Sequence, residues 1–124
     1  HIRRGDYLTL PNHHPVISPR YCKKAIATFP EDFKIIVFSD DIPWCKDAFR
    51  GDNFVFIEGQ TDVEDFFTMS MCKNNIIANS TFSWWGAWLN KNKDKQVIIP
   101  SKWFGISNSH LNTNDLYCDK WIKL

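Results

Sequence analysis

Short apolar runs alternate with longer stretches of helical periodicity along the chain. Four runs are four or five residues long and largely apolar on both faces: 34–38, 54–57, 75–78 and 96–99. Runs of this kind are typical of strands buried in a parallel sheet. The alternation of strand and helix therefore predicts an α/β domain with right-handed crossover connections.

The stretches between these runs carry signals for helix starts. Ser18 as cap and Pro19 at the first helical position predict one helix, and Asp41 is expected to cap another short one. Thr61 and Glu64 have the spacing of a capping box. The apolar stripe expected behind that box consists of Val63, Phe66, Phe67 and Met71.

A fourth helix is predicted in the tryptophan-rich part of the chain. Phe82, Trp85 and Leu89 recur at helical spacing, and we expect Trp85 and Leu89 to lie in the core. A mid-helix Gly86 costs roughly 1 kcal/mol relative to Ala, which indicates a close approach between this helix and a strand. Periodicity is lost after Pro100, so we expect the tail to close over a sheet edge or to dock on another domain.

Composition, net charge and cysteine spacing argue against some classes of function. The chain has 124 residues, a single-domain length, and its net charge of +1 gives no basic field to attract nucleic acid. The tryptophan block also contains no Lys or Arg among its aromatic residues, unlike single-strand binding surfaces. The four cysteines form no C-x-x-C pair, and we expect reduced structural thiols rather than zinc ligands.

The first candidate site is the charged heptapeptide that opens the sequence. If it ends a strand, His1 and Arg3 share one face of that strand. Two guanidinium groups beside a turn at Gly5 suit phosphate recognition, because each offers a planar fork of donors. The alternative is a structural ion pair between Asp6 and Arg3 or Arg4, and both interpretations stay open at this point.

The second candidate site lies where a predicted strand gives way to the tryptophan-rich helix. Ser80 and Thr81 are small hydroxyl residues at that junction. The first N–H groups of a helix lack partners and carry the positive end of the helix dipole, so they favour an anion. The alternative is an ordinary N-cap by Ser80 or Thr81.

A third junction carries two adjacent carboxylates, Asp40 and Asp41. Such a pair has the ligand chemistry for a divalent cation that bridges a diphosphate. The alternative is that Asp41 caps a helix and Asp40 sits in a turn. We favour this second interpretation, because the arginines already supply positive charge.

Two further polar groups have simple structural explanations. Asp62, Glu64 and Asp65 fall in the first turn of a predicted helix, where the dipole favours acids, although one of them is also a candidate for contacting a base. His13 and His14 lie in a loop flanked by prolines with no acid nearby in sequence, and we expect them at the surface.

Taken together, these motifs resemble glycosyltransferase family 11, and specifically its α-1,2-fucosyltransferases. The resemblance rests on H-I-R-R-G-D-Y at 1–7, F-S-D-D at 38–41, N-S-T-F-S-W-W-G-A-W-L at 79–89, and Pro100 with Trp103-Phe104. It implies a Rossmann-like parallel sheet with flanking helices over residues 1–124. This domain would be the GDP-fucose-binding, C-terminal half of a GT-B type enzyme whose N-terminal, acceptor-side domain lies outside this sequence.

The resemblance also implies an activity. The enzyme would be an inverting one that moves L-fucose from GDP-fucose to the 2-hydroxyl of a terminal galactoside, in glycan or O-antigen synthesis, without metal or cofactor. Its partners would be GDP-fucose and a galactose-terminated acceptor, with no nucleic acid. A bacterial member is expected in the cytoplasm with peripheral membrane association, and an animal member in the Golgi. The alternative is a non-catalytic GDP-sugar or glycan-binding module.

Residue roles follow from the same resemblance. The implied donor-binding residues are His1, Arg3, Arg4, Asp65, Asn79, Ser80, Thr81, Phe82 and Ser83. Arg3 would hold the β-phosphate and act in catalysis together with Asp6, and Arg4 would support it. Asp65 would contact guanine, with Asp62 as second choice. No general base can be assigned, because Asp6 is as ready to fix Arg4 and no acid follows it in the loop.

Overall fold

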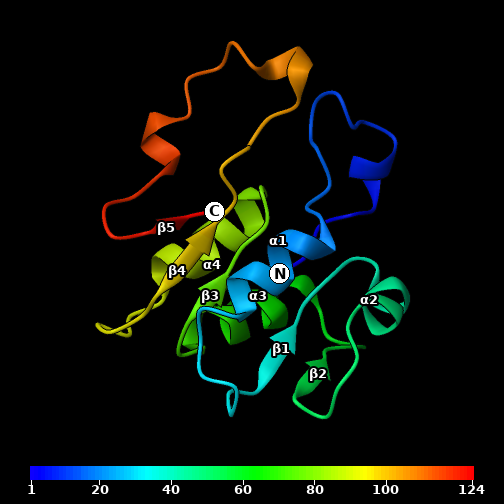
Figure 1. The fold of residues 1–124 in the computed structure, drawn as a ribbon, viewed down its shortest axis with the longest axis vertical. Coiled ribbons are helices and arrows are strands. Elements are labelled where there is room, and N and C mark those ends of the chain that lie inside the picture. The colour runs from blue at the N-terminus through cyan, green and yellow to red at the C-terminus, as the bar shows by residue number, and fades with distance from the viewer.

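The computed structural model describes residues 1–124 as parallel strands flanked by four helices (Figure 1). The strands are β1 (Ile35–Val37), β2 (Phe54–Phe56), β3 (Asn75–Ile76), β4 (Val97–Ile99) and β5 (Ile122–Lys123). The helices are α1 (Pro19–Ile26), α2 (Ile42–Ala48), α3 (Asp62–Met71) and α4 (Thr81–Leu89). Three 3-10 turns cover 6–8, 106–108 and 114–116. The expected α/β architecture with parallel strands is confirmed.

The opening residues join two groups of strands into one layer. β1 pairs with β2, and β4 lies between β3 and β5. Between the groups, the N–H of Ile2 donates to the carbonyl of Phe38 at 2.9 Å, and Ile2 forms a parallel bridge with Ser39. The backbone nitrogen of His1 donates to the carbonyl of Ile76 at 2.9 Å. With this segment counted as the first strand, the order is 3-2-1-4-5-6, that of a doubly wound sheet.

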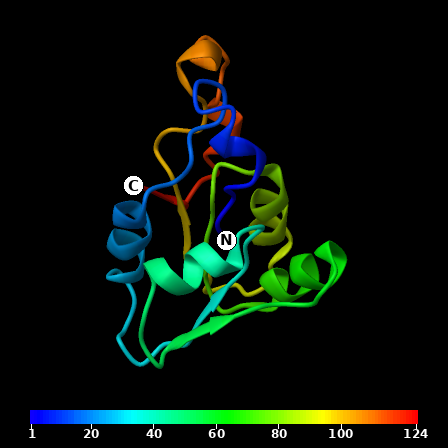
Figure 2. The same ribbon diagram turned by 90° about the vertical axis from the view of Figure 1, so that its right-hand side faces the viewer.

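This strand order indicates where a ligand is expected to bind. In doubly wound sheets, ligands bind beyond the carboxyl ends of the strands where the order reverses. Here the reversal lies between the opening segment and β3. Helix α1 covers one side of the sheet, while α3 and α4 cover the other (Figures 1 and 2). The loops after the opening segment and after β3 therefore meet at the reversal.

Predicted helix starts are confirmed at three positions. The Ser18 hydroxyl accepts from the N–H of Tyr21 at 3.2 Å. Asp41 is the N-cap of α2. Thr61 and Glu64 form both hydrogen bonds of a capping box. These signals act within a few residues, which is why the sequence alone predicts them.

Two apolar clusters form the core. The first lies under α1 and α2 and contains Ile2, Ile17, Cys22, Val37, Cys45, Phe49 and Ala78. The second lies between α4, β4 and the tail and contains Ile77, Ala87, Val97, Ile99 and Trp103. All four cysteines are free, and Cys22 and Cys45 belong to the first cluster.

Helix α4 packs through its small residues rather than its large ones. Gly86 and Ala87 are buried, and a Cβ on Gly86 would lie 3.4 Å from the Cβ of Met69. The close approach expected at Gly86 is thus made to α3, not to a strand. Trp85 and Leu89 are 50% and 48% exposed, so their prediction as core residues is wrong. The small residues occupy the inner face and leave these two side chains outside.

The apolar stripe predicted on α3 is also mostly wrong. Val63, Phe67 and Met71 are exposed, and Met69 is the buried residue of this helix. Helix α3 packs on the side of α4, where the ring of Phe66 lies 5.8 Å from that of Phe82. Helix α3 therefore buries only part of its apolar surface.

The tail after Pro100 closes the far edge of the sheet, which confirms one of the two expectations for it. β5 pairs with β4, and the indole N–H of Trp84 donates to the carbonyl of Leu116 at 2.9 Å. The ring of Trp121 lies 5.6 Å from that of Trp84. Two residues are too few for a strand pattern, so β5 was not predicted.

Asn79 joins three segments above the sheet. Its amide donates to the carbonyls of Pro15 and Trp103 at 3.0 and 2.9 Å, and its own backbone carbonyl accepts from the hydroxyl of Tyr7 at 2.9 Å. The opening loop, the end of β3 and the start of the tail are thus tied at one buried residue.

Replacing Asn79 with Ala should destabilise the protein by about 2–4 kcal/mol, since two bonds are lost and two carbonyls are left without that donor. Urea unfolding of the purified protein measures this. Asn12→Ala is the matched control, because Asn12 is exposed and its side chain makes no hydrogen bond. Equal stability of the two variants would contradict this role of Asn79.

Candidate active site

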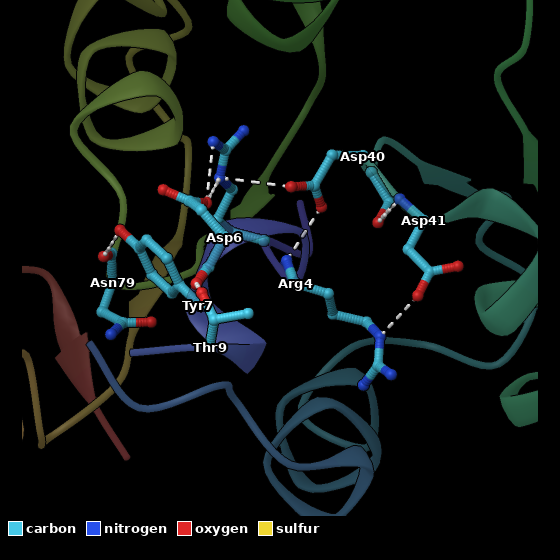
Figure 3. A network of polar contacts seen from close by, with 9 residues as sticks. Arg4, Asp6, Tyr7, Thr9, Asp40, Asp41 and Asn79 are labelled. Carbon is cyan, nitrogen blue, oxygen red and sulfur yellow. Dashed lines mark hydrogen bonds and ion pairs between the residues drawn. The ribbon is translucent and has the colours of Figure 1, made fainter. Parts of the chain in front are cut away.

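Arg4 anchors the opening loop to the end of β1. Its N–H donates to a carboxylate oxygen of Asp40 at 2.8 Å, and its Nε lies 2.9 Å from the carboxylate of Asp41 (Figure 3). The guanidinium carbon also lies 3.7 Å from the centre of the Trp44 ring. The Arg4 side chain is held between an acid and an indole, so its role is to fix the conformation of the loop.

Arg3 is the more exposed of the two arginines. Its side chain is 39% exposed, against 14% for Arg4. Nε lies 3.0 Å from Asp6 and 3.2 Å from Asp40, and Nη2 lies 2.9 Å from Asp6. Nη1 makes no hydrogen bond or ion pair within the chain. Two carboxylates therefore orient Arg3 while part of its fork stays free for an anion.

The ion pairs settle which acid holds which arginine. Asp6 pairs with Arg3 and not with Arg4, which is one of the two structural ion pairs that the sequence left open. Asp41 pairs with Arg4 and also accepts the N–H of Trp44 as the cap of α2. The hydrogen bond from Arg4, with that N–H, holds the pKa of Asp41 below its usual value. Pairing across 37 positions of sequence leaves no local signal.

The same contacts bear on the metal-site alternative for Asp40 and Asp41. Both carboxylates are occupied by arginine side chains and by backbone N–H groups. Nowhere in residues 1–124 do three His, Cys, Asp or Glu side chains gather as a metal site would require. The interpretation of Asp41 as a helix cap is confirmed.

Gly5 permits the close approach of Asp40 to the loop. A Cβ at this position would lie 2.5 Å from a carboxylate oxygen of Asp40. A side chain there would push this acid away from Arg3 and from the Arg4 backbone. The glycine of the R-R-G-D motif is therefore required by the ion-pair network itself.

The start of α4 presents free N–H groups on the other side of the strand-order reversal. Ser80 is the N-cap, but its side chain makes no capping hydrogen bond. The first N–H bonded back is that of Trp84, which donates to the carbonyl of Ser80 at 3.0 Å. The N–H groups of Thr81, Phe82 and Ser83 have no partner. Three N–H donors and the helix dipole are thus available to an anion.

Two predicted donor-binding residues are turned inward. Asn79 and Ser83 are each 1% exposed. The Ser83 hydroxyl lies within hydrogen-bond distance of the carbonyls of Ala78 and Ser80, at 3.4 and 3.3 Å. Their side chains shape the loop and the first helical turn, so only their backbone atoms remain for a ligand.

His1 and Phe82 lie next to each other at the start of α4. Their ring centres are 5.4 Å apart. Phe82 also lines an open pocket of about 400 Å³, together with Phe66, Thr81, Trp85 and Leu89. An apolar hollow beside free N–H donors has the composition of a surface that takes a flat ring next to a phosphate.

Asp65 lies on the first turn of α3, which packs against α4. Its Oδ1 is buried and has no hydrogen-bond partner. Burial, and then the neighbouring Glu64 and Asp62, raise the pKa of Asp65 above its usual value. A buried carboxylate oxygen without a donor is costly for the fold and available to a ligand's N–H groups.

An aromatic stack next to Arg3 was not predicted. The ring of His14 stacks on Tyr7 at 4.9 Å between centres and lies 5.9 Å from Phe104. The Arg3 guanidinium carbon lies 5.9 Å from the Tyr7 ring centre. His13 is exposed as expected, but the prediction that His14 lies at the surface is wrong, since its ring is half-buried. The partner from the tail is 90 residues away, so the sequence offered no signal.

Comparison with known proteins fits this geometry. The family model of Glycosyl transferase family 11 matches residues 1–124. The chain belongs to glycosyltransferase family 11. The resemblance carried by the opening motif and the tryptophan block is thereby confirmed.

The relatives include bacterial and mammalian transferases. The chain is 46% identical to the O-antigen biosynthesis glycosyltransferase WbnK of Escherichia coli and 43% identical to an Escherichia coli alpha-1,2-colitosyltransferase. Both matches cover all of this chain but only 43% and 46% of those proteins. Galactoside alpha-(1,2)-fucosyltransferase 1 of Bos taurus is 34% identical over 72% of the chain and 28% of its own length. No solved structure matches.

The chain therefore spans less than half the length of these curated relatives. None of its helices combines the length and the apolar character needed to cross a membrane. The peripheral membrane association implied by the resemblance stays a prediction.

Asp65→Asn should raise the free energy of unfolding at pH 7 and leave it unchanged below about pH 4. The reason is that a raised pKa in the folded state makes ionisation of Asp65 destabilising as the pH rises. Urea unfolding across this pH range measures the difference. Glu64→Gln should shift stability the other way, because hydrogen bonds from Thr61 lower the pKa of Glu64. A stability loss for Asp65→Asn at pH 7 would show that the ionised carboxylate does not strain the fold.

Proposed function

We propose that this chain is the donor-binding part of an inverting α-1,2-fucosyltransferase that uses GDP-fucose. The observation that carries the proposal is the meeting of two anion-binding groups at the reversal of the strand order. Arg3 follows the opening segment, and the free N–H groups of α4 follow β3. A diphosphate placed between them would be held from both walls.

Charge development explains how this arrangement would accelerate transfer. As the bond between the fucosyl C1 and the phosphate oxygen breaks, negative charge grows on the departing GDP. Arg3 and the α4 donors are fixed before the reaction, so they would stabilise that charge without rearranging. Preorganised donors of this kind contribute about 3–4 kcal/mol each.

The guanine base would lie toward α3 and α4. The unpartnered Oδ1 of Asp65 can accept N–H donors from the guanine edge, and His1 and Phe82 offer ring surfaces nearby. Arg4, Asn79 and Ser83 would act behind these contacts, because their side chains are held inside the protein.

The acceptor would be held mainly by the rest of the protein. Family relatives are more than twice as long as this chain. We infer that residues 1–124 form the donor-side domain of a two-domain, GT-B type enzyme, with the acceptor, a galactose-terminated glycan, bound across the cleft between the domains. Transfer of fucose by the isolated 124 residues would contradict this division.

Colitose is the alternative to fucose as the donor sugar. One relative that is 43% identical is an alpha-1,2-colitosyltransferase, while the mammalian relatives are fucosyltransferases. We favour fucose because the motif set resembles the fucosyltransferases. Parallel assays of the full-length protein with GDP-fucose and GDP-colitose on a terminal galactoside distinguish the two donors.

In that assay, Arg3→Ala should lower kcat by at least about a hundredfold, because the departing diphosphate loses its guanidinium partner. Free GDP and the fucosylated product are both measured. Arg20→Ala is the matched control, since Arg20 is exposed and forms no ion pair. Near-normal turnover by Arg3→Ala would refute the proposed role. GDP binding by the wild type without any product would favour the non-catalytic module.

Asp65→Asn should weaken GDP binding roughly ten- to a hundredfold, the range expected for one charge-assisted hydrogen bond. Binding of ADP should not change, because adenine lacks the donor pair of the guanine edge. Calorimetric titration of the full-length protein with both nucleotides measures the ratio. An equal loss for ADP and GDP would remove Asp65 from guanine recognition.

A further inference from the structure

We propose that His14 is the general base of the transfer reaction and that its Nε2 accepts the proton of the acceptor hydroxyl. This inference rests on the proposed function. It concerns a residue that was expected at the surface and that the donor site does not use. Three observations support it: the place of the ring, its free nitrogen, and the state of the nearby acids.

The His14 ring lies one layer away from the donor-binding groups. It stacks on Tyr7 at an interplanar angle of 21°. The hydroxyl of Tyr7 donates to the carbonyl of Asn79, which directly precedes the N-cap of α4, and the Arg3 guanidinium lies 5.9 Å from the same ring. Tyr7 thus touches both walls of the diphosphate site, and His14 is the next side chain outward.

The backbone around His14 is fixed on both sides. Its N–H donates to the carbonyl of Leu10 at 2.9 Å. The preceding carbonyl, that of His13, accepts the N–H of Gly105 from the tail at 2.8 Å. The ring of Phe104 closes the other side of the imidazole. A catalytic base needs this kind of positioning to meet an incoming hydroxyl.

One imidazole nitrogen stays available. Neither imidazole nitrogen forms a hydrogen bond or ion pair within the chain, and Nδ1 is buried. A neutral imidazole with Nε2 unprotonated can take a proton there. The residue as a whole is half-buried.

The nearby acids are already engaged. Asp6 and Asp40 pair with Arg3, and Asp41 pairs with Arg4. The loop from Leu8 to Pro15 contains no acid. His14 is therefore the group beside Tyr7 that can accept a proton without breaking an ion pair.

The step balances as a substitution at the sugar carbon. The acceptor oxygen forms a bond to the fucosyl C1 while the bond from C1 to the phosphate oxygen breaks. The hydroxyl proton passes to Nε2, and the electron pair of the broken bond leaves with GDP. The imidazolium then returns its proton to water, so no further reactant is needed.

The charged groups around the ring are few. Tyr7 contacts it directly, and Arg3 and Asp6 lie beyond Tyr7 on the same loop. Burial is the main cause that raises the pKa of Tyr7, so this phenol stays neutral across the physiological range. From the tail, Phe104 and Gly105 bring no charge. A limb of the pH profile of kcat that disappears with His14 can then be assigned to this residue.

In the full-length enzyme, His14→Gln should lower kcat at least about a hundredfold and leave the KM for GDP-fucose within about twofold. The dependence of kcat on pH should also differ from that of the wild type. His13→Gln, at the exposed neighbouring position, is the matched control and should keep both the rate and the pH profile. GDP affinity, measured by titration, reports whether each variant is folded.

His14→Phe separates catalysis from packing. This variant can keep the stack between Tyr7 and Phe104 but has no nitrogen, so the same loss of kcat, about a hundredfold, is expected. A smaller loss in His14→Phe, or a retained pH profile in either variant that binds GDP, would overturn the inference. Absence of transfer by the wild-type enzyme would instead overturn the proposed function.

Discussion

Two backbone hydrogen bonds at the first two residues hold the architecture together. Ile2 bonds to Phe38 and His1 bonds to Ile76, so one short segment makes a single layer from two groups of strands. Because this segment is central, the strand order reverses beside it, and the loops that carry Arg3 and the first N–H groups of α4 leave the sheet at the same place. The positions of Arg3, of the α4 N–H groups and of the Tyr7 ring all depend on this placement.

The ion pairs of the opening loop fix its conformation and also orient Arg3. Asp40 and Asp41 are adjacent, yet they hold different arginines. Arg4 is held between Asp41 and the Trp44 ring, while the more exposed Arg3 is oriented by Asp6 and Asp40 and keeps part of its guanidinium free. The Oδ1 of Asp65 is likewise unpaired within the chain and available to a ligand, and burial raises the pKa of this acid.

Local signals predicted local structure well. The caps at Ser18, Asp41 and Thr61 act over three residues, and the buried runs identified four of the five strands. Contacts between distant segments were not predictable. The exposure of Trp85 depends on small residues packing elsewhere on α4, and the stack around His14 needs a tail segment 90 positions away. The motifs pointed to Arg3 and to the start of α4 as candidates, whereas the ion-pair partners of the two arginines could be found only from the fold.

Burial lowers the reactivity expected of the four free cysteines toward alkylating reagents and oxidants. Burial raises the pKa of Cys22 to about 11, and it also raises the pKa of Cys45, Cys72 and Cys118. At pH 7 roughly one Cys22 side chain in ten thousand is then a thiolate, the form that alkylating reagents and oxidants attack. A single cysteine introduced on the exposed face of α3 would therefore be labelled far faster than the native thiols.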